Sequence, residues 1–476
     1  MFIADSMREW LEQLEKEGEV IRIKEEVDKN WEISSAARQI FAWPEEERPV
    51  LIYDNVKGFD IPVVVAAYAN RRRFGKAFGA TIEEIWPKFK KAIAEPIEPK
   101  VVETGPCKEN IMIGDEVDLF KFPVPIWSPD KDAGPYLTAP LVITKDPETG
   151  IQNVGTYRCH IQEKNRIGIN IHRERHGGFH ITKWEELNEP MDIAICLGSE
   201  PTVPIASVGP VPYGTDEVAV CGALKGRAVE VVKGETVDLM IPATTEIVIE
   251  GKIYPKSVVS EAPFGEFTGY MGGNRLSPRV DVTAITFRNK PIFHSFLSQR
   301  PPSESSMIRK AVNEPIMLEK LRAIGIPGIV DLSMSEASGS WFHGTVSIKK
   351  MYPGHAREVM TACWGVGSTF FRRITIVDDE INVRDPFEVE WAVATRCRPD
   401  KDIVIIPEHI TTILDPVMTQ DMQRDMPGGI TAKYGIDATK SHEYNQIALP
   451  DEKYLKMAKE KFEKYGIKRL NQENFK

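Results

Sequence analysis

The strongest constraint on the fold is a change of strand pattern near residue 305. Between about residue 115 and that point, short β-rich runs follow one another with turn residues between them, which is typical of β-hairpins. After it, strand-like and helix-like segments alternate, which predicts βαβ units and a mostly parallel sheet. A chain of 476 residues is also too long for one ordinary core. We therefore expect an α/β protein of several domains.

The β-rich part contains three candidate turns. They lie at Gly150, at Glu250-Gly251 and at Asn289-Lys290, each between two strand-like runs. We expect a hairpin at each turn and a β-barrel or sandwich overall. After residue 305, segments 344–350, 373–379 and 402–406 are predicted strands, and 353–365 and 385–397 are predicted helices.

Both ends of the chain predict amphipathic helices. Near the start, Ser6 and Glu9 form a capping-box pattern, and a stripe of apolar residues follows. Predicted strands at 19–27, 48–56 and 61–69 and a helix at 81–95 come next. At the other end, segment 451–466 places Leu455, Ala458, Phe462 and Tyr465 on one stripe. Such a helix can pack on its own chain or on a second subunit.

Composition excludes several classes of protein. The formal net charge of −10 argues against a nucleic-acid binder. We find neither an apolar run long enough for a membrane span nor a signal-peptide pattern, so we expect a cytoplasmic protein without a membrane partner. The six cysteines form no CxxC pair and are expected to be reduced thiols. P-loop, dinucleotide, zinc-protease and nucleophile-elbow motifs do not occur.

Four patches carry residues suited to chemistry. They are GIQNVGTYRCHI (150–161), NIHRERHGGFH (170–180), ASVGPVPYGTDEVAVCGAL (206–224) and SEAPFGEFTG (260–269). In the second patch, His172, His176 and His180 could bind a metal or be ordinary surface or core residues. In the third, Asp216 and Glu217 precede an apolar run, where burial is costly unless the charge is paired or metal-bound. Alternatively, the pair ends a loop in solvent.

The last patch has two glutamates, Glu261 and Glu266, around a proline and a glycine. At this spacing a helix would set them apart around its axis, and a strand would put them on opposite faces. Pro263 and Gly265 indicate an irregular segment instead. Such a segment permits both carboxylates to approach one partner, although surface acids would also fit the pattern.

Together with VDDEINVRD (377–385) and YGIDATK (434–440), these patches resemble the UbiD family of prenylated-FMN-dependent decarboxylases. The resemblance implies prenylated FMN as cofactor, with its phosphate held through Mn²⁺ (or Mg²⁺) and a K⁺ ion nearby. By the same resemblance, the divalent-metal ligands are Asn153, His176 and Glu217. The implied K⁺ ligands are Ala206, Ser207 and Glu217, and the implied flavin contacts are Thr156, Tyr157, Arg158 and Arg175.

The resemblance also implies a catalytic set of Arg158, Glu261 and Glu266. A guanidinium can hold a substrate carboxylate through a bidentate hydrogen bond. Glu261 is expected to keep Arg158 in place. Glu266 is expected to return a proton to the substrate carbon after CO₂ leaves. Phe267, the next residue, is expected to shape the pocket for a planar apolar substrate.

The implied architecture has an N-terminal α/β domain (1–110), a central split β-barrel that binds the flavin (111–310) and a C-terminal α/β domain with a mostly parallel sheet (311–445). A last helix (446–476) is a candidate subunit interface in a homodimer or homohexamer. The expected function is reversible, non-oxidative decarboxylation of an aromatic or α,β-unsaturated acid. A flavin prenyltransferase would supply the cofactor. Alternatives are a non-catalytic or partner-dependent subunit of an aromatic carboxylase complex and an ordinary FMN-binding reductase.

Overall fold

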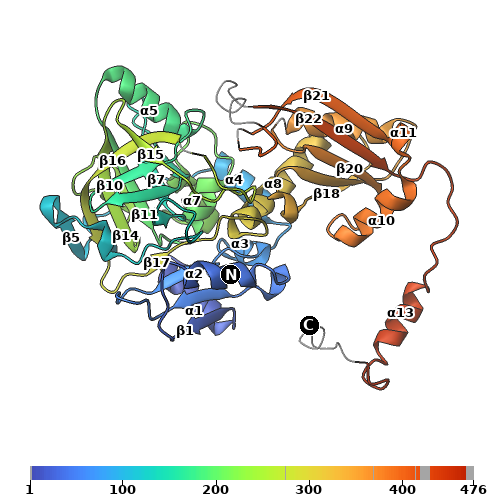
Figure 1. Cartoon of the computed structure of the whole chain (residues 1–476), viewed down its shortest axis with the longest axis horizontal. Coiled ribbons are helices and arrows are strands. Elements are labelled where there is room, and N and C mark those ends of the chain that lie inside the picture. Colours follow the sequence, from blue (N-terminus) through green and yellow to red (C-terminus); the bar gives the residue numbers. More distant parts are fainter. Residues whose placement is uncertain (1–2, 274, 368, 413, 419–428, 468–476) are drawn as a thin grey trace.

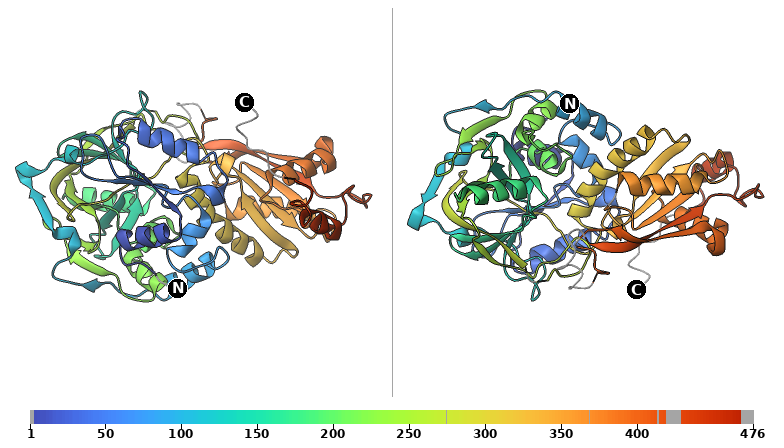
Figure 2. Two further views of the ribbon diagram at one scale, coloured as in Figure 1. Left: turned by 90° about the horizontal axis from the view of Figure 1, so that it is seen from below. Right: turned by 90° about the horizontal axis from the view of Figure 1, so that it is seen from above.

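The computed structural model describes residues 3–467 except 274, 368, 413 and 419–428. The end of the predicted C-terminal segment, 468–476, therefore lies outside the described residues. Figure 1 shows a central β-rich body, an N-terminal body beside it and a C-terminal sheet at the far end. The two further views in Figure 2 show α8 (Glu304–Ala323) between the central body and the C-terminal sheet. The molecule is thus mixed α/β and built from several bodies.

The N-terminal body combines helices with a four-stranded sheet. Its order is β1 (Val20–Ile23), β2 (Val50–Tyr53), β3 (Val63–Val65) and β17 (Phe293–His294). The predicted first helix is present as α1 (Met7–Lys16), with the Ser6 side chain accepting a hydrogen bond from the Glu9 N–H. The other helices are α2 (Glu32–Ile40), α3 (Arg71–Lys76) and α4 (Ile85–Ala94).

The central body is a ten-stranded antiparallel sheet. Its main path is β6-β9-β10-β16-β14-β11-β7-β8, and β5 and β15 also pair with β16. The strands are β5 (Asn110–Ile113), β6 (Tyr136–Leu137), β7 (Leu141–Lys145), β8 (Gln152–Thr156), β9 (Cys159–Glu163), β10 (Arg166–Ile169), β11 (Met191–Leu197), β14 (Ile247–Ile253), β15 (Val258–Glu261) and β16 (Arg275–Phe287). Buried apolar clusters lie on both sides of it. Around the sheet lie α5 (His176–Leu187), α6 (Thr202–Val208), α7 (Glu217–Lys225) and a small sheet of β4 (Lys100–Val101), β12 (Glu230–Lys233) and β13 (Met240–Pro242).

The three hairpin predictions for this region have different outcomes. The hairpin at Gly150 is confirmed, because β7 and β8 pair antiparallel around it. The hairpin at Glu250-Gly251 is wrong, because β14 runs straight through both residues. Gly251 lies at a register shift against β16, and a Cβ there would lie 2.6 Å from the Asp281 carbonyl oxygen. The glycine therefore permits close strand approach instead of a turn.

The hairpin predicted at Asn289-Lys290 is also wrong. The chain does turn there, and Lys290 has a φ of 50°. The strand that follows, β17, pairs in parallel with β3 of the N-terminal sheet and not with β16. Residues 293–294 are thus joined to the first body by a pairing that local sequence does not specify.

The C-terminal body is a five-stranded sheet in the order β18-β19-β20-β22-β21. Its elements are β18 (Ile329–Met334), β19 (His343–Ile348), α9 (His355–Val366), β20 (Arg373–Asp378), α10 (Pro386–Arg396), α11 (Pro399–Asp402), β21 (Ile403–Ile410) and β22 (Ile430–Ala438). Only β19-β20 and β20-β22 are parallel, whereas β18-β19 and β21-β22 are antiparallel. The prediction of a mostly parallel sheet is therefore wrong. The 3₁₀ turn at Glu336–Ser338 between β18 and β19 is too short for a parallel crossover.

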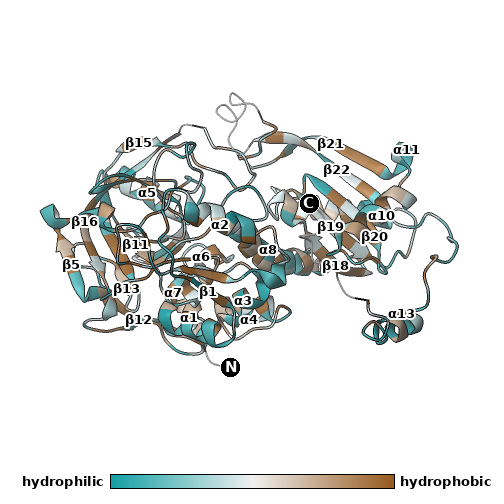
Figure 3. Cartoon of the chain, turned by 60° about the horizontal axis from the view of Figure 1, so that its bottom comes forward, coloured by the Kyte–Doolittle hydropathy of each residue, from teal (hydrophilic) through white to brown (hydrophobic). Residues whose placement is uncertain are grey.

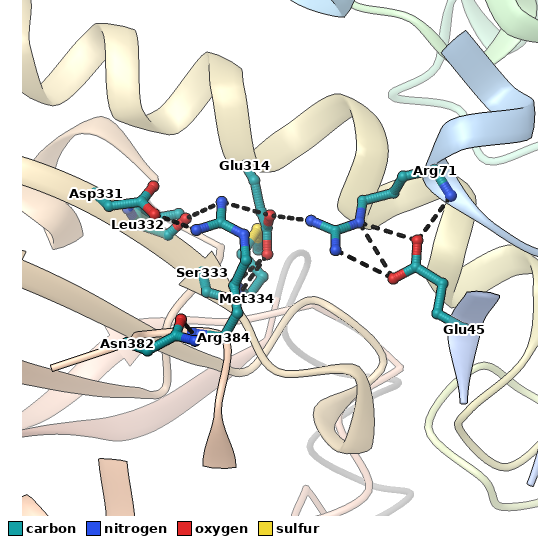
Figure 4. Close-up of polar contacts among 9 residues, drawn as sticks. All are labelled: Glu45, Arg71, Glu314, Asp331, Leu332, Ser333, Met334, Asn382 and Arg384. Carbon is teal, nitrogen blue, oxygen red and sulfur yellow. Dashed lines mark hydrogen bonds and ion pairs between the residues drawn. The ribbon is translucent and has the colours of Figure 1, made fainter. Parts of the chain in front are cut away.

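Helix α8 connects the bodies through side chains at its start and in its middle. The buried carboxylate of Glu304 accepts hydrogen bonds from the backbone N–H groups of Ala66 and Tyr68. Glu314 accepts hydrogen bonds from the Met334 N–H at 2.6 Å and the Ser333 hydroxyl at 3.0 Å. Its other oxygen lies 3.5 Å from nitrogens of both Arg71 and Arg384, so that one carboxylate joins three segments (Figure 4). Residue 315, next in the helix, is a proline.

The C-terminal helix predicted over 451–466 is helical only in its first half, as α13 (Glu452–Lys459), which lies apart from the rest of the chain in Figure 1. All four residues of its predicted apolar stripe are exposed. In Figure 3 hydrophobic colour also marks β21, where Ile403, Ile405 and Ile410 are exposed. All six cysteines are free. Every helix within the described ranges is too short or too polar to cross a bilayer.

Candidate active site

Three predicted site residues meet in the central body. Arg158, in the turn between β8 and β9, donates from Nε and Nη2 to the two oxygens of Glu261, at 2.8 and 3.0 Å. It also donates from Nη1 to Glu266 Oε1 at 2.6 Å. The Glu261 side chain is 0 % exposed and that of Glu266 is 11 % exposed. Two acids five residues apart thus hold one guanidinium.

The backbone explains how this spacing works. Glu261 ends β15, and the chain then leaves the strand through Pro263. A compact turn follows, in which the N–H of Glu266 donates to the Tyr270 carbonyl at 2.8 Å and the N–H of Gly272 donates to the Phe264 carbonyl at 2.8 Å. The turn brings Glu266 back toward Arg158, as neither a straight strand nor a helix would.

Electrostatics reinforce the arrangement. Burial alone would lower the pKa of Arg158, but the two carboxylates outweigh burial and raise that pKa above its ordinary value. The Arg158 guanidinium also lies 5.1 Å from the Phe264 ring centre. Burial and nearby Glu261 raise the pKa of Tyr136, so the phenol stays neutral. The set therefore contains one fixed cation between two acids.

A second group of predicted residues lies where two helices begin. His176 is the first residue of α5, Glu217 is the first of α7, and Asn153 lies on β8. His176 Nδ1 lies 3.2 Å from Asn153 Oδ1 and 3.9 Å from Glu217 Oε1. Glu217 is 3 % exposed, and its Oε2 accepts a hydrogen bond from the Val154 N–H at 2.7 Å. Burial raises the pKa of Glu217.

The donor set fits a hard divalent cation. In the orientation with Oδ1 toward His176, the Asn153 oxygen, the imidazole nitrogen and the Glu217 oxygen bring three lone pairs to one place. Neighbouring ligands around an octahedral ion at about 2.1 Å lie about 3 Å apart; the His176–Asn153 separation of 3.2 Å is close to this, whereas His176 and Glu217, at 3.9 Å, would have to draw together around an ion. If the Asn153 amide is turned over, its nitrogen donates to Glu217 and His176, both at 3.2 Å. The three side chains are then hydrogen-bonded to one another without an ion. Within the described residues, no cluster of three His, Cys, Asp or Glu side chains has metal-site geometry, so this site depends on the amide.

The remaining predicted residues surround this group. The hydroxyls of Thr156 and Ser207 lie 2.8 Å apart, which places α6 against β8, and Ala206 is buried beside Ser207. The Tyr157 hydroxyl accepts a weak hydrogen bond from the Gly177 N–H at 3.4 Å. Arg175 caps α5 without a side-chain hydrogen bond to that helix. The helix starts also attract anions, as a flavin phosphate would require.

Other candidate residues have structural partners. His180 is buried, with its Nδ1 2.9 Å from the Thr144 hydroxyl, and burial lowers its pKa to about 4. The imidazole of His172 lies 3.7 Å from Glu174, on the loop before α5. Asp216 caps α7 by accepting a hydrogen bond from the Val218 N–H at 2.7 Å. Of the three histidines, only His176 therefore joins the candidate metal group.

Sequence reasoning missed the residues that the C-terminal half brings to Phe267. The Trp341 and Phe342 rings lie 5.8 and 5.9 Å from the Phe267 ring, and the Arg309 guanidinium lies 4.4 Å from its centre. A separate cavity of about 310 Å³ adjoins Glu266 and is lined in part by Arg38, Lys131 and Arg300. No local motif marks these residues, because they come from distant parts of the chain.

Comparison with known proteins finds matches over nearly the whole chain. Three family models match the chain: the N-terminal (11–93), Rift-related (100–301) and C-terminal (306–438) domains of 3-octaprenyl-4-hydroxybenzoate carboxy-lyase. An uncharacterized protein of Archaeoglobus fulgidus is 35% identical over 92% of each chain.

Solved structures are similar over nearly the whole chain. The UbiD-class enzyme HmfF of Pelotomaculum thermopropionicum, in complex with FMN, is 34% identical with a TM-score of 0.85, over 95% of this chain and 99% of that one. An evolved dimeric form of it, in complex with prFMN, has a TM-score of 0.83 at 33% identity, over 96% and 100% of the two chains. Vanillic acid decarboxylase of Sedimentibacter hydroxybenzoicus is 29% identical with a TM-score of 0.80, over 97% and 99%. The chain belongs to the UbiD family, whose name describes carboxy-lyases.

Proposed function

We propose that this protein catalyses the reversible, non-oxidative decarboxylation of an aromatic or α,β-unsaturated carboxylic acid with prenylated FMN. The observation that carries the proposal is the set of Arg158 between Glu261 and Glu266. The similarity to an enzyme bound to prFMN and to a vanillic acid decarboxylase supports it. An ordinary FMN reductase has no need of this buried set, and neither has a non-catalytic subunit.

Arg158 has room for a substrate carboxylate. Its guanidinium has five N–H donors, and the two glutamates use three of them. One N–H on Nη1 and one on Nη2 remain, and these two form a fork that matches a carboxylate when Glu266 takes the Nη1 hydrogen on the Cδ side. Glu261 fixes the neighbouring Nε–Nη2 edge, so the fork has a defined direction. We assign Arg158 the binding of the reacting carboxylate and Glu261 its positioning.

Glu266 is suited to moving the proton. It makes one hydrogen bond to Arg158 through Oε1, and its side chain is slightly exposed next to the 310 Å³ cavity. In its acid form it can deliver a proton to the substrate carbon after CO₂ departs, and water in the cavity can restore that proton. Run in reverse, the same carboxylate removes the proton before CO₂ adds.

Asn153, His176 and Glu217 would hold Mn²⁺ or Mg²⁺ at the flavin phosphate. Ala206, Ser207 and Glu217 would hold K⁺. Thr156, Tyr157 and Arg175 would contact the flavin itself. When bound, prenylated FMN supplies an electrophilic centre that accepts the electrons released with CO₂. A flavin prenyltransferase would provide the cofactor, and we propose a cytoplasmic homodimer or homohexamer.

The test is co-expression with a flavin prenyltransferase, followed by absorbance and intact-cofactor mass measurements. The same sample is then screened with aromatic and unsaturated acids for CO₂ release. We expect a prenylated flavin, bound manganese and turnover of at least one acid. Protein with plain FMN or without flavin would favour the reductase or the subunit alternative.

A matched variant tests the proton carrier. Glu266→Gln keeps the size of the side chain and an oxygen that can accept from Arg158, but it cannot donate an acidic proton. We expect flavin and metal contents as in the wild type and a loss of turnover of roughly 10²- to 10⁴-fold. Wild-type turnover in this variant would remove Glu266 from the mechanism.

A further inference from the structure

The cavity of about 310 Å³ beside Glu266 gathers positive charge. Its lining includes Arg38, Lys131 and Arg300, which come from three separate segments of the chain. Among the described lining residues, Glu266 is the only acid, and its carboxylate is already hydrogen-bonded to Arg158. In the part of the chain that the structure describes, none of the three cations forms an ion pair with a carboxylate. The cavity therefore carries positive charge that no described acid compensates.

Arg38 is the most constrained of these cations. It lies on α2, and its Nη1 donates to the carbonyl oxygen of Pro302 at 2.7 Å and to that of Arg300. These bonds fix the guanidinium in a half-buried position, where burial and the charges of Arg300 and Arg48 lower its pKa. The charge of Glu336 acts in the opposite direction, but that carboxylate pairs with Arg48. Holding arginines together in this way costs free energy unless an anion joins them.

The rest of the lining supplies neutral hydrogen-bonding groups on a fixed wall. Ser34, Ser35 and Ser128 are hydroxyl residues, and Gln299 carries an amide. The Gln299 amide donates to the Ser128 hydroxyl at 3.0 Å, and the carboxylate of Asp132 accepts from the Ser128 N–H at 2.6 Å. This side of the cavity is thus held in place by the chain itself. Guanidinium, ammonium and hydroxyl groups are donors that bind phosphate oxygens in proteins.

The number of cations favours a phosphate group over a carboxylate. A phosphate ester carries about two negative charges at neutral pH and has three strong acceptor oxygens. A carboxylate has a single charge and two oxygens, which one guanidinium fork satisfies. Glu266 both lines the cavity and contacts Arg158, so an acid held at Arg158 would lie beside the cavity. Its other end would then be next to the three cations.

We propose that this cavity binds a phosphate group, and that the acid on which the enzyme acts carries it as an ester at the end away from the reacting carboxylate. Free inorganic phosphate has the same chemistry and is the other source of such an anion. The assignment to the substrate rests on the proposed function, because it takes Arg158 and Glu266 as the reacting end.

Calorimetric titration of protein co-expressed with the prenyltransferase tests the inference. The probes are inorganic phosphate, 4-(phosphonooxy)benzoate and (E)-6-(phosphonooxy)hex-2-enoate, together with the parent hydroxy acid of each ester. We expect at least one phosphorylated acid to bind the wild type roughly ten- to a hundredfold more tightly than its parent, as charge-assisted hydrogen bonds would give.

Three variants locate the binding. Arg38→Gln should reduce the preference for the phosphorylated acid to within about threefold, and Lys131→Gln should weaken it by roughly three- to tenfold. Lys131 is exposed, so its replacement keeps the test valid if Arg38→Gln does not fold, which a melting curve shows. The control is Lys16→Gln, an exposed lysine on α1 outside the cavity lining, which should bind as the wild type does. Flavin content should be the same in all four proteins.

Two outcomes would overturn the inference. Either no phosphate-bearing probe, inorganic phosphate included, binds the wild type more tightly than the parent acids do, or the preference persists in both cavity variants. If inorganic phosphate binds through Arg38 and Lys131 while the esters gain nothing, the phosphate site stands and its assignment to the substrate is overturned. The proposed function fails differently, by an absence of prenylated flavin and of CO₂ release from every acid, whereas the titration does not depend on turnover.

Discussion

Replacing Glu261 and Glu266 one at a time separates the structural role of these two acids from their chemical role. We predict that Glu261→Gln lowers stability much more than Glu266→Gln does, whereas Glu266→Gln lowers kcat more. Each change removes one negative charge and keeps the shape of the side chain. The two variants are therefore controls for each other.

The magnitude follows from the contacts. Glu261 is fully buried and makes two charged hydrogen bonds to Arg158, and a glutamine can keep only one of them. A hydrogen bond to a charged group contributes roughly 1.5 to 3 kcal/mol, and removing one partner of a buried pair costs roughly 3 to 5 kcal/mol. Because Glu266 still pairs with Arg158, we expect a loss of about 3 kcal/mol. For Glu266, with one bond that an amide oxygen can keep, we expect about 1 kcal/mol.

The assay is thermal unfolding followed by near-UV circular dichroism, which reports packing around aromatic residues. For a domain of about 200 residues, 1 kcal/mol shifts Tm by about 2 to 4 °C. We expect Tm to fall by about 6 to 12 °C for Glu261→Gln and by about 2 to 4 °C for Glu266→Gln. On loaded enzyme, Glu261→Gln should mainly raise KM, because Arg158 loses its fixed direction. Equal Tm shifts, or a larger shift for Glu266→Gln, would refute this division of roles.

Other variants test separate parts of the molecule. Glu314→Gln should lower the free energy of unfolding by roughly 2 to 4 kcal/mol, because two arginines lose a buried carboxylate. The control, Glu319→Gln on the exposed side of α8, should change it by less than about 1 kcal/mol. Equal shifts in Tm for the two variants would contradict this prediction. Burial lowers the pKa of His294 to about 4. Its contribution to stability is therefore present above the unfolded pKa of about 6.5 and is lost as the pH falls toward 4. In His294→Phe the dependence of Tm on pH should flatten between these two values, and an unchanged dependence would contradict this prediction. Glu217→Gln should purify with less manganese and less flavin than wild type, measured by elemental analysis and absorbance, and full loading would exclude the metal bridge.

The sequence predicted the helices well where a helix end is set by residues next to it in the chain. Ser6 caps α1, and Asp385 followed by Pro386 starts α10, as their types require. Gly251 was misassigned, because a glycine permits both a turn and close strand contact, and only the partner strand decides which. The pairing of β17 with β3 joins segments about 230 residues apart, which no local pattern contains.

The same distinction applies to the site. The proline and glycine between Glu261 and Glu266 indicate a turn that can bring both acids to one partner, whereas that partner, Arg158, and their roles were predicted only from the resemblance to the UbiD family. Arg309 has no such mark, since helical spacing makes it one of several charged residues on α8. Its place beside the candidate site appears only when the fold sets it against Phe267.

The proline in α8 has a consequence for motion between the bodies. Pro315 cannot donate to the carbonyl of Ala311, so the helix is weakest directly after Glu314. The first half of α8 is anchored by Glu304 and carries Arg309, whereas the second half leads into the C-terminal sheet. A bend at Pro315 would let that sheet move while Arg309 stays with Phe267, and it would strain the contacts of Glu314 with Ser333 and Met334. Because Trp341 and Phe342 lie beyond the bend, such a movement would uncover one wall of the pocket and leave its charged end in place.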